Sequence, residues 1–487
     1  MRNEMDSSVY PLGRRRTLVV LGAVVLGMLL ASINQTIVAT ALPTIAADLG
    51  GLDHYSWVFS AYMLGSTISI PLYGKLSDVH GRRPLFLIGI GLFAVGSIAA
   101  ALAPSMGVLV AARTVQGIGA GGLIPLGVAV IGDVIPPRER GRWQSLLGVV
   151  FAGSNVAGPA IGGSLADDAS WRLAFVVSLP LAAAAAAAML LGFVDVAERR
   201  PSRIDWRGSV LLVGATSAGL LAAVWGGQDY AWTSPVIVSL LVAAAALGVA
   251  FARHERREPD PLIPPRLLRL PAIARADIAL FAVGAAAFGA ILFLPLFVQE
   301  VLGTSATRAG AVLTPFMLSW IAASIVAGQI VSRTGRVRPV LLAGPPTMAV
   351  GFVLLMLMGP GTGIWSATGY AMVLGVGIGL VMQTLVIVVQ NAAPRGTMGV
   401  VTATAQFSRS IGQTVGAALM GAIVNAGLAS DVTDAAPADL ADALQPAFAA
   451  GIGLAAIALV AIAALPRIEL RARVPGRAPS AAAARAR

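Results

Sequence analysis

Two arginines lie inside long apolar runs of the sequence. Arg113 falls within residues 106–131 and Arg409 within residues 398–424. A charged side chain inside a membrane costs free energy unless it faces a partner or a polar cavity, so it commonly marks the path of an ion or a substrate. Arg113 is also near enough to the end of its run for its long side chain to reach the membrane surface. The two residues predict binding and movement of a solute.

Polar side chains accompany these arginines. Gln406, Arg409 and Gln413 are spaced by three and seven residues from Gln406, so a helix places all three on one face. We expect this face to line a solute-binding cavity, with aromatic side chains as apolar walls, although the aromatic residues would equally suit simple packing. The predicted cavity comprises Asn34, Gln35, Arg113, Gln116, Phe151, Asn155, Trp320, Gln383, Gln390, Gln406, Phe407, Arg409 and Gln413.

Other kinds of chemistry lack the residues that they need. The chain has no cysteine, which excludes disulfides, thiolate–metal sites and cysteine nucleophiles. His54, His80 and His254 are scattered among loops, and their spacing does not form a metal site. An enzyme would need converging acids, bases or metal ligands, which the apolar runs do not supply. We therefore expect no enzymatic activity, no metal and no cofactor.

The composition places most of the chain in lipid. The 487 residues are 57% hydrophobic and 12% charged, with a mean hydropathy of +0.82, whereas soluble domains are roughly one quarter charged. Crossing a bilayer takes about 20 apolar residues. Fourteen runs are long enough, at residues 17–43, 55–73, 84–103, 106–131, 143–164, 171–194, 209–226, 234–252, 276–298, 308–331, 339–358, 364–390, 398–424 and 447–466.

The basic residues orient these runs. With the N-terminus inside and the loops alternating, all but four of the 34 Lys and Arg residues fall on the inner side. Arg172 and Arg308 fall outside, and Arg113 and Arg409 lie within runs. This distribution follows the positive-inside rule and assigns both termini to the cytoplasm. The net charge of +11 is then expected to attract anionic lipid rather than nucleic acid.

Two further features bear on origin and processing. The first apolar run is too long for a cleavable signal and predicts a retained span. Lys75 is the only lysine, and Ala and Gly are abundant, which suggests a GC-rich bacterial genome. We expect a monomeric, multi-pass protein of the bacterial inner membrane, whose partners are a small amphipathic substrate, protons and membrane lipid.

A short polar loop, residues 74–83, joins the second and third runs. Its pattern, G-x-L-x-D-x-x-G-R-R, resembles the signature loop of the major facilitator superfamily, which lies between the second and third helices on the cytoplasmic side. Gly74 and Gly81 allow a tight turn and close backbone approach. Asp78 can sit at the positive N-terminus of a neighbouring helix, while Arg82 and Arg83 hold the loop on the cytoplasmic side.

The next inner loop also resembles that of the superfamily, and the resemblance makes Asp133 the expected partner of Arg82. Asp78, Arg82 and Asp133 would then form a cytoplasmic latch, which holds one conformation and must break for the other. As a plain surface pair the same residues would contribute little stability. The full predicted latch is Gly74, Asp78, Gly81, Arg82, Arg83 and Asp133.

Three more motifs resemble those of the superfamily's fourteen-span drug:proton antiporters. Residues 113–119 have the pattern R-x-x-Q-G-x-G, and residues 158–163 have G-P-x-x-G-G, which the exporters carry. Residues 30–43 resemble the first-helix motif, except that Asn34 stands where the family usually has an aspartate. Small residues let helices pack closely and proline bends a helix, so we expect a hinge in the fifth run, an ordinary packing face being the alternative. The predicted hinge residues are Gly153, Gly158, Pro159, Gly162 and Gly163.

The resemblance covers nearly the whole chain and implies an all-α membrane protein with the major facilitator fold. Residues 328–336 are a degraded copy of the opening loop, 254 residues downstream, with Arg333 in place of the acidic residue. The implied order is 14 transmembrane helices as 6 + 2 + 6, in two parallel halves. The predicted domains are a six-helix bundle at 1–202, an inserted pair at 203–262, a second bundle at 263–466 and a disordered basic tail at 467–487.

The expected function is secondary active export of amphipathic drugs or other hydrophobic compounds by alternating access, driven by protons. The alternative is an exporter or facilitator of a lipid or an anionic metabolite, without proton coupling at position 34. A channel would need repeated pore-lining segments, and the two-halved repeat argues against one. A receptor on the same fold would be recognised by the absence of substrate flux.

Proton coupling needs a side chain that changes its charge, and Asn34 cannot titrate. Three explanations stay open. Asn34 is an introduced substitution that mimics a permanently protonated carrier, or coupling runs through another group such as Glu300 or Asp133, or the protein is uncoupled and its arginines attract an anionic or lipid-like substrate. The proton-coupling candidates are Asn34, Arg113, Asp133 and Glu300.

Overall fold

The structure is a computed structural model, and its described residues are almost entirely helical. They are residues 14–49, 55–135, 170–194, 205–227, 230–304, 306–394, 396–428 and 436–466, with isolated positions between 136 and 169. Phe151, Asn155, Pro159, Gly162 and Gly163, and the predicted tail at 467–487, lie outside the described residues.

The described residues of the first bundle form four long helices and a further helix that is broken into two parts. Their bounds are α2 (Arg14–Leu49), α3 (Tyr55–His80), α4 (Arg82–Ala101), α5 (Met106–Val134), α7 (Leu173–Val176) and α8 (Ser178–Gly192). Within it α5 packs against α2, α3 and α4, and its glycines allow this crowding. A Cβ added to Gly119, for example, would lie 2.6 Å from the carbonyl oxygen of Gly89 on α4.

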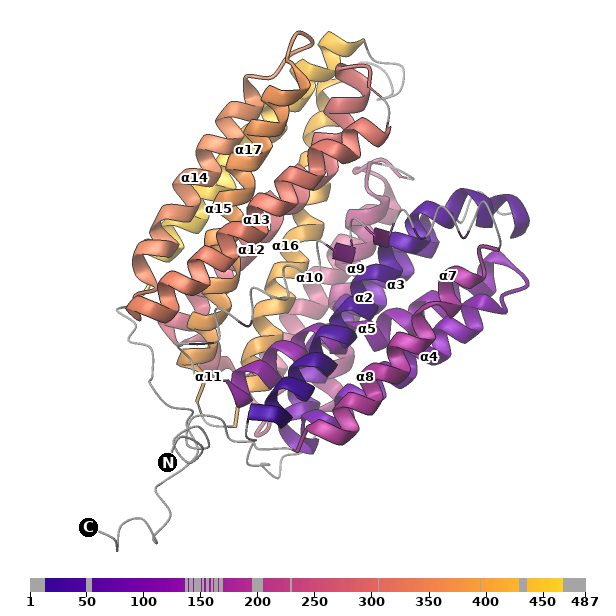
Figure 1. Ribbon diagram of the computed structural model, residues 1–487, viewed down its shortest axis with the longest axis vertical. Helices are drawn as coiled ribbons and strands as arrows, with labels where there is room; N and C mark the ends of the chain where they lie inside the picture. Colours follow the sequence, from indigo (N-terminus) through magenta and orange to yellow (C-terminus); the bar gives the residue numbers. More distant parts are fainter. Residues whose placement is uncertain are drawn as a thin grey trace, which may run out of the picture.

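The second bundle follows a pair of helices, α9 (Trp206–Trp225) and α10 (Pro235–Glu255). Its elements are α11 (Pro265–Leu268), α12 (Pro271–Leu296), the π-helical turn η2 (Phe297–Val301), α13 (Ala306–Thr334), α14 (Arg338–Met356), α15 (Ile364–Ala392), α16 (Met398–Gly427) and α17 (Pro437–Ala463). Figure 1 shows the two bundles inclined to each other, close together at the end near α11 and diverging at the opposite end, with α9 and α10 between them.

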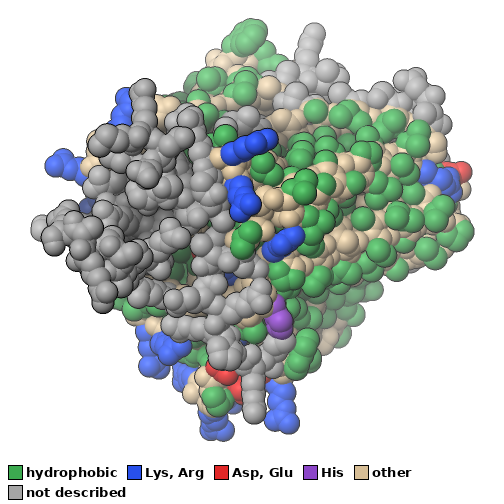
Figure 2. All heavy atoms as spheres, turned by 60° about the horizontal axis from the view of Figure 1, so that its bottom comes forward, with side chains coloured by type: hydrophobic (Ala, Val, Ile, Leu, Met, Phe, Trp, Pro, Cys, Tyr) green, Lys and Arg blue, Asp and Glu red, His purple; other side chains and the backbone are tan. Residues whose placement is uncertain are grey.

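Eleven helical stretches of the described chain are long and apolar enough to cross a membrane. Hydrophobic side chains cover a broad face of the molecule in Figure 2. The long helices α3 and α16 are outside this set of eleven, because they carry the polar side chains of the interior. The chain is therefore a multi-pass membrane protein. The predicted run 143–164 falls largely outside the described residues, so the total of fourteen spans stays a prediction.

Helix α17 begins earlier than predicted. Its first residue is Pro437, whereas the apolar run begins at 447. Pro suits the first helical position because the amide that it lacks would have no partner inside the helix. Asp439 in the first turn is favoured by the positive end of the helix. The acidic stretch before the apolar run is thus partly helical.

The two polar loops have the same local geometry. Gly81 has a φ of 97° and Gly335 a φ of 69°, which only glycine adopts without strain. The amide of Gly81 donates to the carbonyl of Ser77 at 3.0 Å, and that of Gly335 donates to the carbonyl of Val331 at 2.8 Å. Aligning Gly81 with Gly335 makes Ser332 the residue equivalent to Asp78. The prediction that Arg333 takes the place of the acidic residue is therefore wrong by one position.

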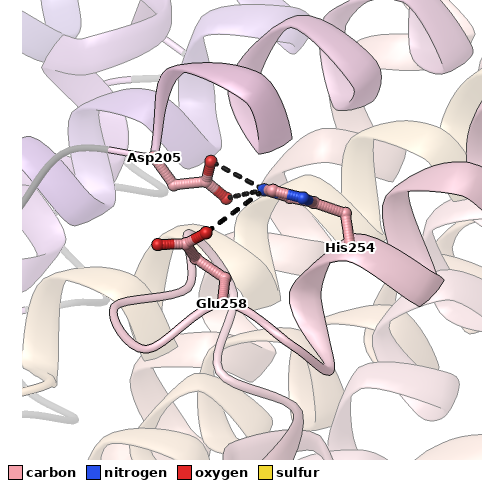
Figure 3. A group of neighbouring side chains, drawn as sticks. All are labelled: Asp205, His254 and Glu258. Carbon is pink, nitrogen blue, oxygen red and sulfur yellow. Dashed lines mark hydrogen bonds and ion pairs between the residues drawn. The ribbon is translucent and has the colours of Figure 1, made fainter.

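The helices α9 and α10 are joined at one end by a cluster of side chains (Figure 3). The Nε2 atom of His254 lies 2.9 Å from Oδ1 of Asp205 and 3.6 Å from Oε2 of Glu258. Asp205 also caps α9, since its Oδ1 accepts from the amide of Gly208 at 2.8 Å. The contact of His254 with Asp205 joins the end of α10 to the start of α9. Within α10 itself, Ile237 and Glu255 are the buried residues.

The pair α9/α10 contacts both bundles. Leu212 of α9 packs with Leu72 of α3 and Phe407 of α16 in one apolar cluster. At the other end of α9, the rings of Trp225 and Trp57 of α3 are 5.3 Å apart. The pair therefore lies along the line where α3 and α16 meet.

The predicted topology is tested with single cysteines, since the native chain has none. Gly361 lies between α14 and α15, Arg336 lies between α13 and α14, and both are exposed. We expect a membrane-impermeant maleimide to label Gly361→Cys in intact cells, and Arg336→Cys only after permeabilisation. The cysteine-free protein is the control. Labelling of Arg336→Cys in intact cells would contradict the orientation.

Candidate functional site

Arg82 is the centre of a buried ion cluster at the start of α4. Its Nη1 lies 2.6 Å from Oδ1 of Asp78, and its Nε lies 3.0 Å from Oδ2 of Asp133. Its Nη1 also donates to Oγ of Ser77 at 2.6 Å. Only 2% of Arg82 is exposed. Charges buried in this way are strongly coupled, so removing one partner costs far more than breaking a surface pair.

The carboxylate of Asp78 also binds the second bundle. Its Oδ1 accepts from the amide of Gly399 at 2.9 Å, and its Oδ2 accepts from the amide of Val400 at 2.8 Å. These amides belong to the first turn of α16, where they have no partner inside the helix and carry the positive end of the helix dipole. One carboxylate thus joins Arg82 of the first bundle to the N-terminus of α16.

Glycines bring the two backbones close enough for this contact. A Cβ added to Gly399 would lie 2.6 Å from the carbonyl oxygen of Gly74, and one added to Gly74 would lie 3.0 Å from the carbonyl oxygen of Gly399. A larger residue at either position would separate α3 from α16.

Gln390 makes a second contact between the bundles at the same end. Its Nε2 donates to the carbonyl of Val128 on α5 at 2.9 Å and lies 3.4 Å from Oγ1 of Thr402. Only 2% of Gln390 is exposed. We predicted it in the cavity, and the structure places it in the contact between α5 and α15.

A separate polar network surrounds Arg113 within the first bundle. Nη1 of Arg113 donates to Oδ1 of Asn34 at 2.7 Å and to Oε1 of Gln116 at 2.5 Å. Its Nε donates to the carbonyl of Val58 at 3.1 Å, and its guanidinium lies 4.3 Å from the ring centre of Tyr62. Arg113 and Asn34 are both fully buried, so Arg113 does not reach the membrane surface by snorkelling.

Gln116 extends this network to two serines that the sequence analysis missed. Its Nε2 donates to Oγ of Ser97 at 2.7 Å, and Oγ of Ser178 lies 3.3 Å from Oγ of Ser97. The network therefore crosses α2, α5, α4 and α8. Serines inside apolar runs carry little signal in a sequence, because a hydroxyl can bond to its own helix.

The network leaves two donors unused. Nη2 of Arg113 and Nδ2 of Asn34 have no hydrogen-bond partner among the residues that the structure describes. Arg113 also forms no ion pair with a described carboxylate. A buried cation without a counterion is a strong attractor for a negative charge.

Arg409 is the second cation of the interior. It is half-buried in α16, its Nη1 lies 3.9 Å from Sδ of Met382 on α15, and its Nε has no partner among the described residues. Gln406 is buried and Gln413 half-buried. The three residues share a helix face, and the role of this face as a cavity wall stays a prediction.

The remaining predicted residues are dispersed. Nε2 of Gln35 lies 2.7 Å from Sδ of Met63, and the ring of Trp320 packs at 6.2 Å from that of Phe316. Phe407 is half-buried and packs against an apolar cluster formed by Leu212, Leu262 and Ile263. Gln383 is half-buried on α15, and Glu300 is exposed in η2.

The remaining latch and hinge residues are also described in part. The side chain of Arg83 donates to the carbonyl of Leu190. Of the predicted hinge residues, Gly153 and Gly158 are described, and Gly158 packs against Thr36.

Asp277 was also missed. The apolar run begins at 276, which put Asp277 at the membrane boundary, whereas α12 begins at Pro271 and buries it in the second turn. The signal was Pro271 itself, since proline is common at the first position of a helix.

The sequence is similar to those of known membrane transporters. The profile of the Major Facilitator Superfamily matches residues 24–417. An uncharacterized MFS-type transporter of Mycobacterium tuberculosis is 38% identical over 405 residues, which are 83% of this chain and 59% of the relative. The multidrug transporter protein MdtP of Bacillus subtilis is 35% identical over 420 residues, 86% of this chain and 77% of the relative.

A solved structure with a similar fold is that of the human organic anion transporter MFSD10. It matches with a TM-score of 0.67 and 18% identity, covering 92% of this chain and 99% of that one. The chain spans 59% of the length of the mycobacterial relative.

The contact between Asp78 and α16 is tested by Asp78→Asn. The change removes the charge shared by Arg82 and the helix N-terminus, and we expect it to weaken closure by about 2 kcal/mol, roughly thirty-fold in the equilibrium. Spin labels at the exposed positions His80 and Pro394 should show a longer distance population. Asp439→Asn, at another helix start, is the control, and an unchanged distance distribution would contradict the prediction.

Proposed function

Because the chain belongs to the Major Facilitator Superfamily, we propose that it is a secondary active exporter that moves amphipathic compounds out of the cytoplasm. The observation that carries this proposal is the contact of Asp78 with the first turn of α16. It joins the two bundles at one end, where a carrier that opens alternately to the two sides needs a contact that can form and break. Substrate and protons would shift the balance between the two states by binding them unequally.

The end of the molecule at which Asp78 joins the two bundles corresponds to the cytoplasmic side of the predicted topology. Arg82, Asp78 and the amides of Gly399 and Val400 would act as the latch of this side. Opening must separate a carboxylate from a helix N-terminus and expose the ion cluster to water. Hydration of the freed groups offsets much of the lost attraction, so such a contact can be both specific and reversible.

The choice of drugs as substrates rests on the relatives. MdtP and the multidrug resistance protein 3 of Bacillus subtilis, the latter 35% identical over 405 residues, carry names that describe multidrug transport. The proposed setting is a monomer with fourteen spans in the bacterial inner membrane. The two bundles, the inserted pair and the glycine-rich hinge would serve as its moving parts.

Position 34 decides how protons are coupled. An aspartate there would place a carboxylate beside the guanidinium of Arg113, where the amide oxygen of Asn34 now lies at 2.7 Å. Protonation of that carboxylate would break an ion pair, whereas Asn34 always resembles the protonated form. We propose proton antiport, with the coupled proton carried by a group other than Asn34, which has no titrating side chain.

A second candidate function is export of a lipid or an anionic metabolite. It is favoured by Arg113 and Arg409, which have unused donors and no carboxylate partner among the described residues. An anion entering between the bundles would supply the missing charge. A cationic drug would be repelled by both arginines at short range.

Transport into inverted membrane vesicles separates these functions. We expect ethidium to accumulate when the vesicle interior is acidic, and nigericin, which dissipates the pH gradient, to abolish accumulation. Vesicles without the protein are the control. Flux of fluorescent phosphatidylglycerol with no ethidium flux would favour the second function, and the absence of any flux would contradict both.

Proton release on ethidium binding tests position 34. In purified protein, Asn34→Asp is expected to release more protons than the native chain, because a bound cation competes with the proton of a carboxyl beside Arg113. The control is Gln35→Glu, which adds an acid to the next position, whose side chain points to Met63. Equal release from the native chain and Asn34→Asp would discard position 34 as a carrier position.

A further inference from the structure

Asp277 is a buried carboxyl that the proposed latch and the Arg113 network do not use. It lies in the second turn of α12, roughly 9 Å along the axis from the first residue of the helix. Only 7% of it is exposed. An ionisable residue buried in a membrane-spanning helix is costly and is by default a candidate for function.

Its side chain belongs to the face of α12 that meets α16. Phe281 and Gly284 follow Asp277 at one and two turns, so the three residues share that face. A Cβ added to Gly412 of α16 would lie 2.8 Å from the carbonyl carbon of Phe281, and one added to Gly284 would lie 2.6 Å from the carbonyl oxygen of Arg409. Asp277 therefore lies at the interface of α12 and α16, nearer its latch end.

Neither oxygen of Asp277 has a hydrogen-bond partner among the described residues. Water solvates a carboxylate strongly, whereas an interior without donors does not, so burial disfavours the charged form. The neutral acid loses much less on burial. The geometry thus suits a carboxyl that holds a proton in this conformation.

No described cation compensates its charge. Arg409 is the charged residue of α16, and its guanidinium is directed to Met382 of α15. On α12 itself, Arg275 donates to the carbonyl of Ala464. The other ionisable groups whose side chains are described on elements that pack against α12 are Arg266 of α11, Glu300 of η2, Arg333 of α13, Tyr370 of α15, and Asp439 and Asp442 of α17; none of these forms a hydrogen bond with Asp277. The side chain of Arg308 on α13 lies outside the described residues.

The helix that Asp277 faces is the one that the latch holds. Residues 399–406 of α16 are all buried, with Gly74 of α3 packed against Gly399 and Ala403. Helix α16 as a whole also packs against α12, α17, α5 and α15. Release of Asp78 from the first turn of α16 would uncover the α3 side of this stretch. Water would then approach the interface where Asp277 lies.

We propose that Asp277 is a proton-carrying site coupled to the latch. It keeps its proton while α16 is bound by Asp78. When the latch opens, the O–H bond of the carboxyl breaks and its proton passes to water on the cytoplasmic side, leaving a hydrated carboxylate. This inference deepens the proposed proton antiport and supplies the titrating group that Asn34 cannot provide.

Infrared difference spectroscopy of the purified full-length protein in lipid nanodiscs tests the site. At neutral pH we expect the carbonyl stretch of a protonated carboxylic acid, lost in Asp277→Asn and kept at a shifted frequency in Asp277→Glu. The second variant retains the carboxyl and guards against a folding defect of the first. An unchanged band in Asp277→Asn would overturn the proposal.

The link to the latch has its own measurement. In Asp78→Asn the band should titrate at a pH lower by about one unit, a ten-fold loss of proton affinity, because the open state hydrates Asp277. Asp439→Asn, on the exposed first turn of α17, should titrate like the native chain. Equal midpoints for the native chain and Asp78→Asn would overturn the coupling.

Transport distinguishes this inference from the proposed function on which it rests. In inverted vesicles, Asp277→Asn should lose at least ten-fold in ethidium accumulation driven by a pH gradient, while Asp439→Asn keeps it. Full accumulation by Asp277→Asn would overturn the role of Asp277. If the native chain ignores the gradient, proton antiport itself fails, and the infrared band alone decides whether Asp277 holds a proton.

Discussion

The structure depends on one carboxylate that serves two bundles. Asp78 contacts Arg82 on its own side and two backbone amides of α16 on the other. Every residue except proline offers a backbone amide at a helix start, so the specificity of the contact resides in Asp78 and in the glycines that let it approach. Other polar side chains of α3 bond within the first bundle: Tyr62 donates to the carbonyl of Ala31 and Ser69 to the carbonyl of Ile118.

Among the described residues, three further ionisable groups lie in the interior with few or no partners, Arg113 and Asp277 buried and Arg409 half-buried. Arg113 is satisfied in part by neutral acceptors, Asn34, Gln116 and the carbonyl of Val58. Arg409 has a thioether neighbour, and Asp277 has none among the described residues. A fold that keeps such groups unpaired gives up stability at those positions. The interior is thus prepared for a charge that arrives with a ligand or a proton.

Much of this arrangement was accessible from the sequence. The spacing of residues 74–83 predicted the position of Asp78 at a helix N-terminus and its pairing with Arg82, because those contacts are local or follow a family pattern. Which helix of the other bundle Asp78 meets was not accessible, and neither were the remaining contacts across the bundles. Gln390 and Phe407 were assigned to a cavity because they share faces with other polar or aromatic residues, but only the packing of α5, α15 and α9 decides what those faces meet. Asp277 was missed because hydropathy places a helix start by its apolar residues, while α12 starts at a proline several residues earlier.

The position of α9 and α10 affects the route by which a membrane-dissolved molecule reaches the interior. Lipophilic compounds concentrate among the acyl chains, and a carrier can admit them sideways through a gap between its bundles. On the flank where α3 and α16 meet, the apolar cluster around Leu212 packs against both helices through Leu72 and Phe407, and most side chains of α10 are left outside the protein core. For the proposed exporter, we expect lateral entry from the opposite flank, so that the two flanks of the molecule would differ in function within the plane of the bilayer.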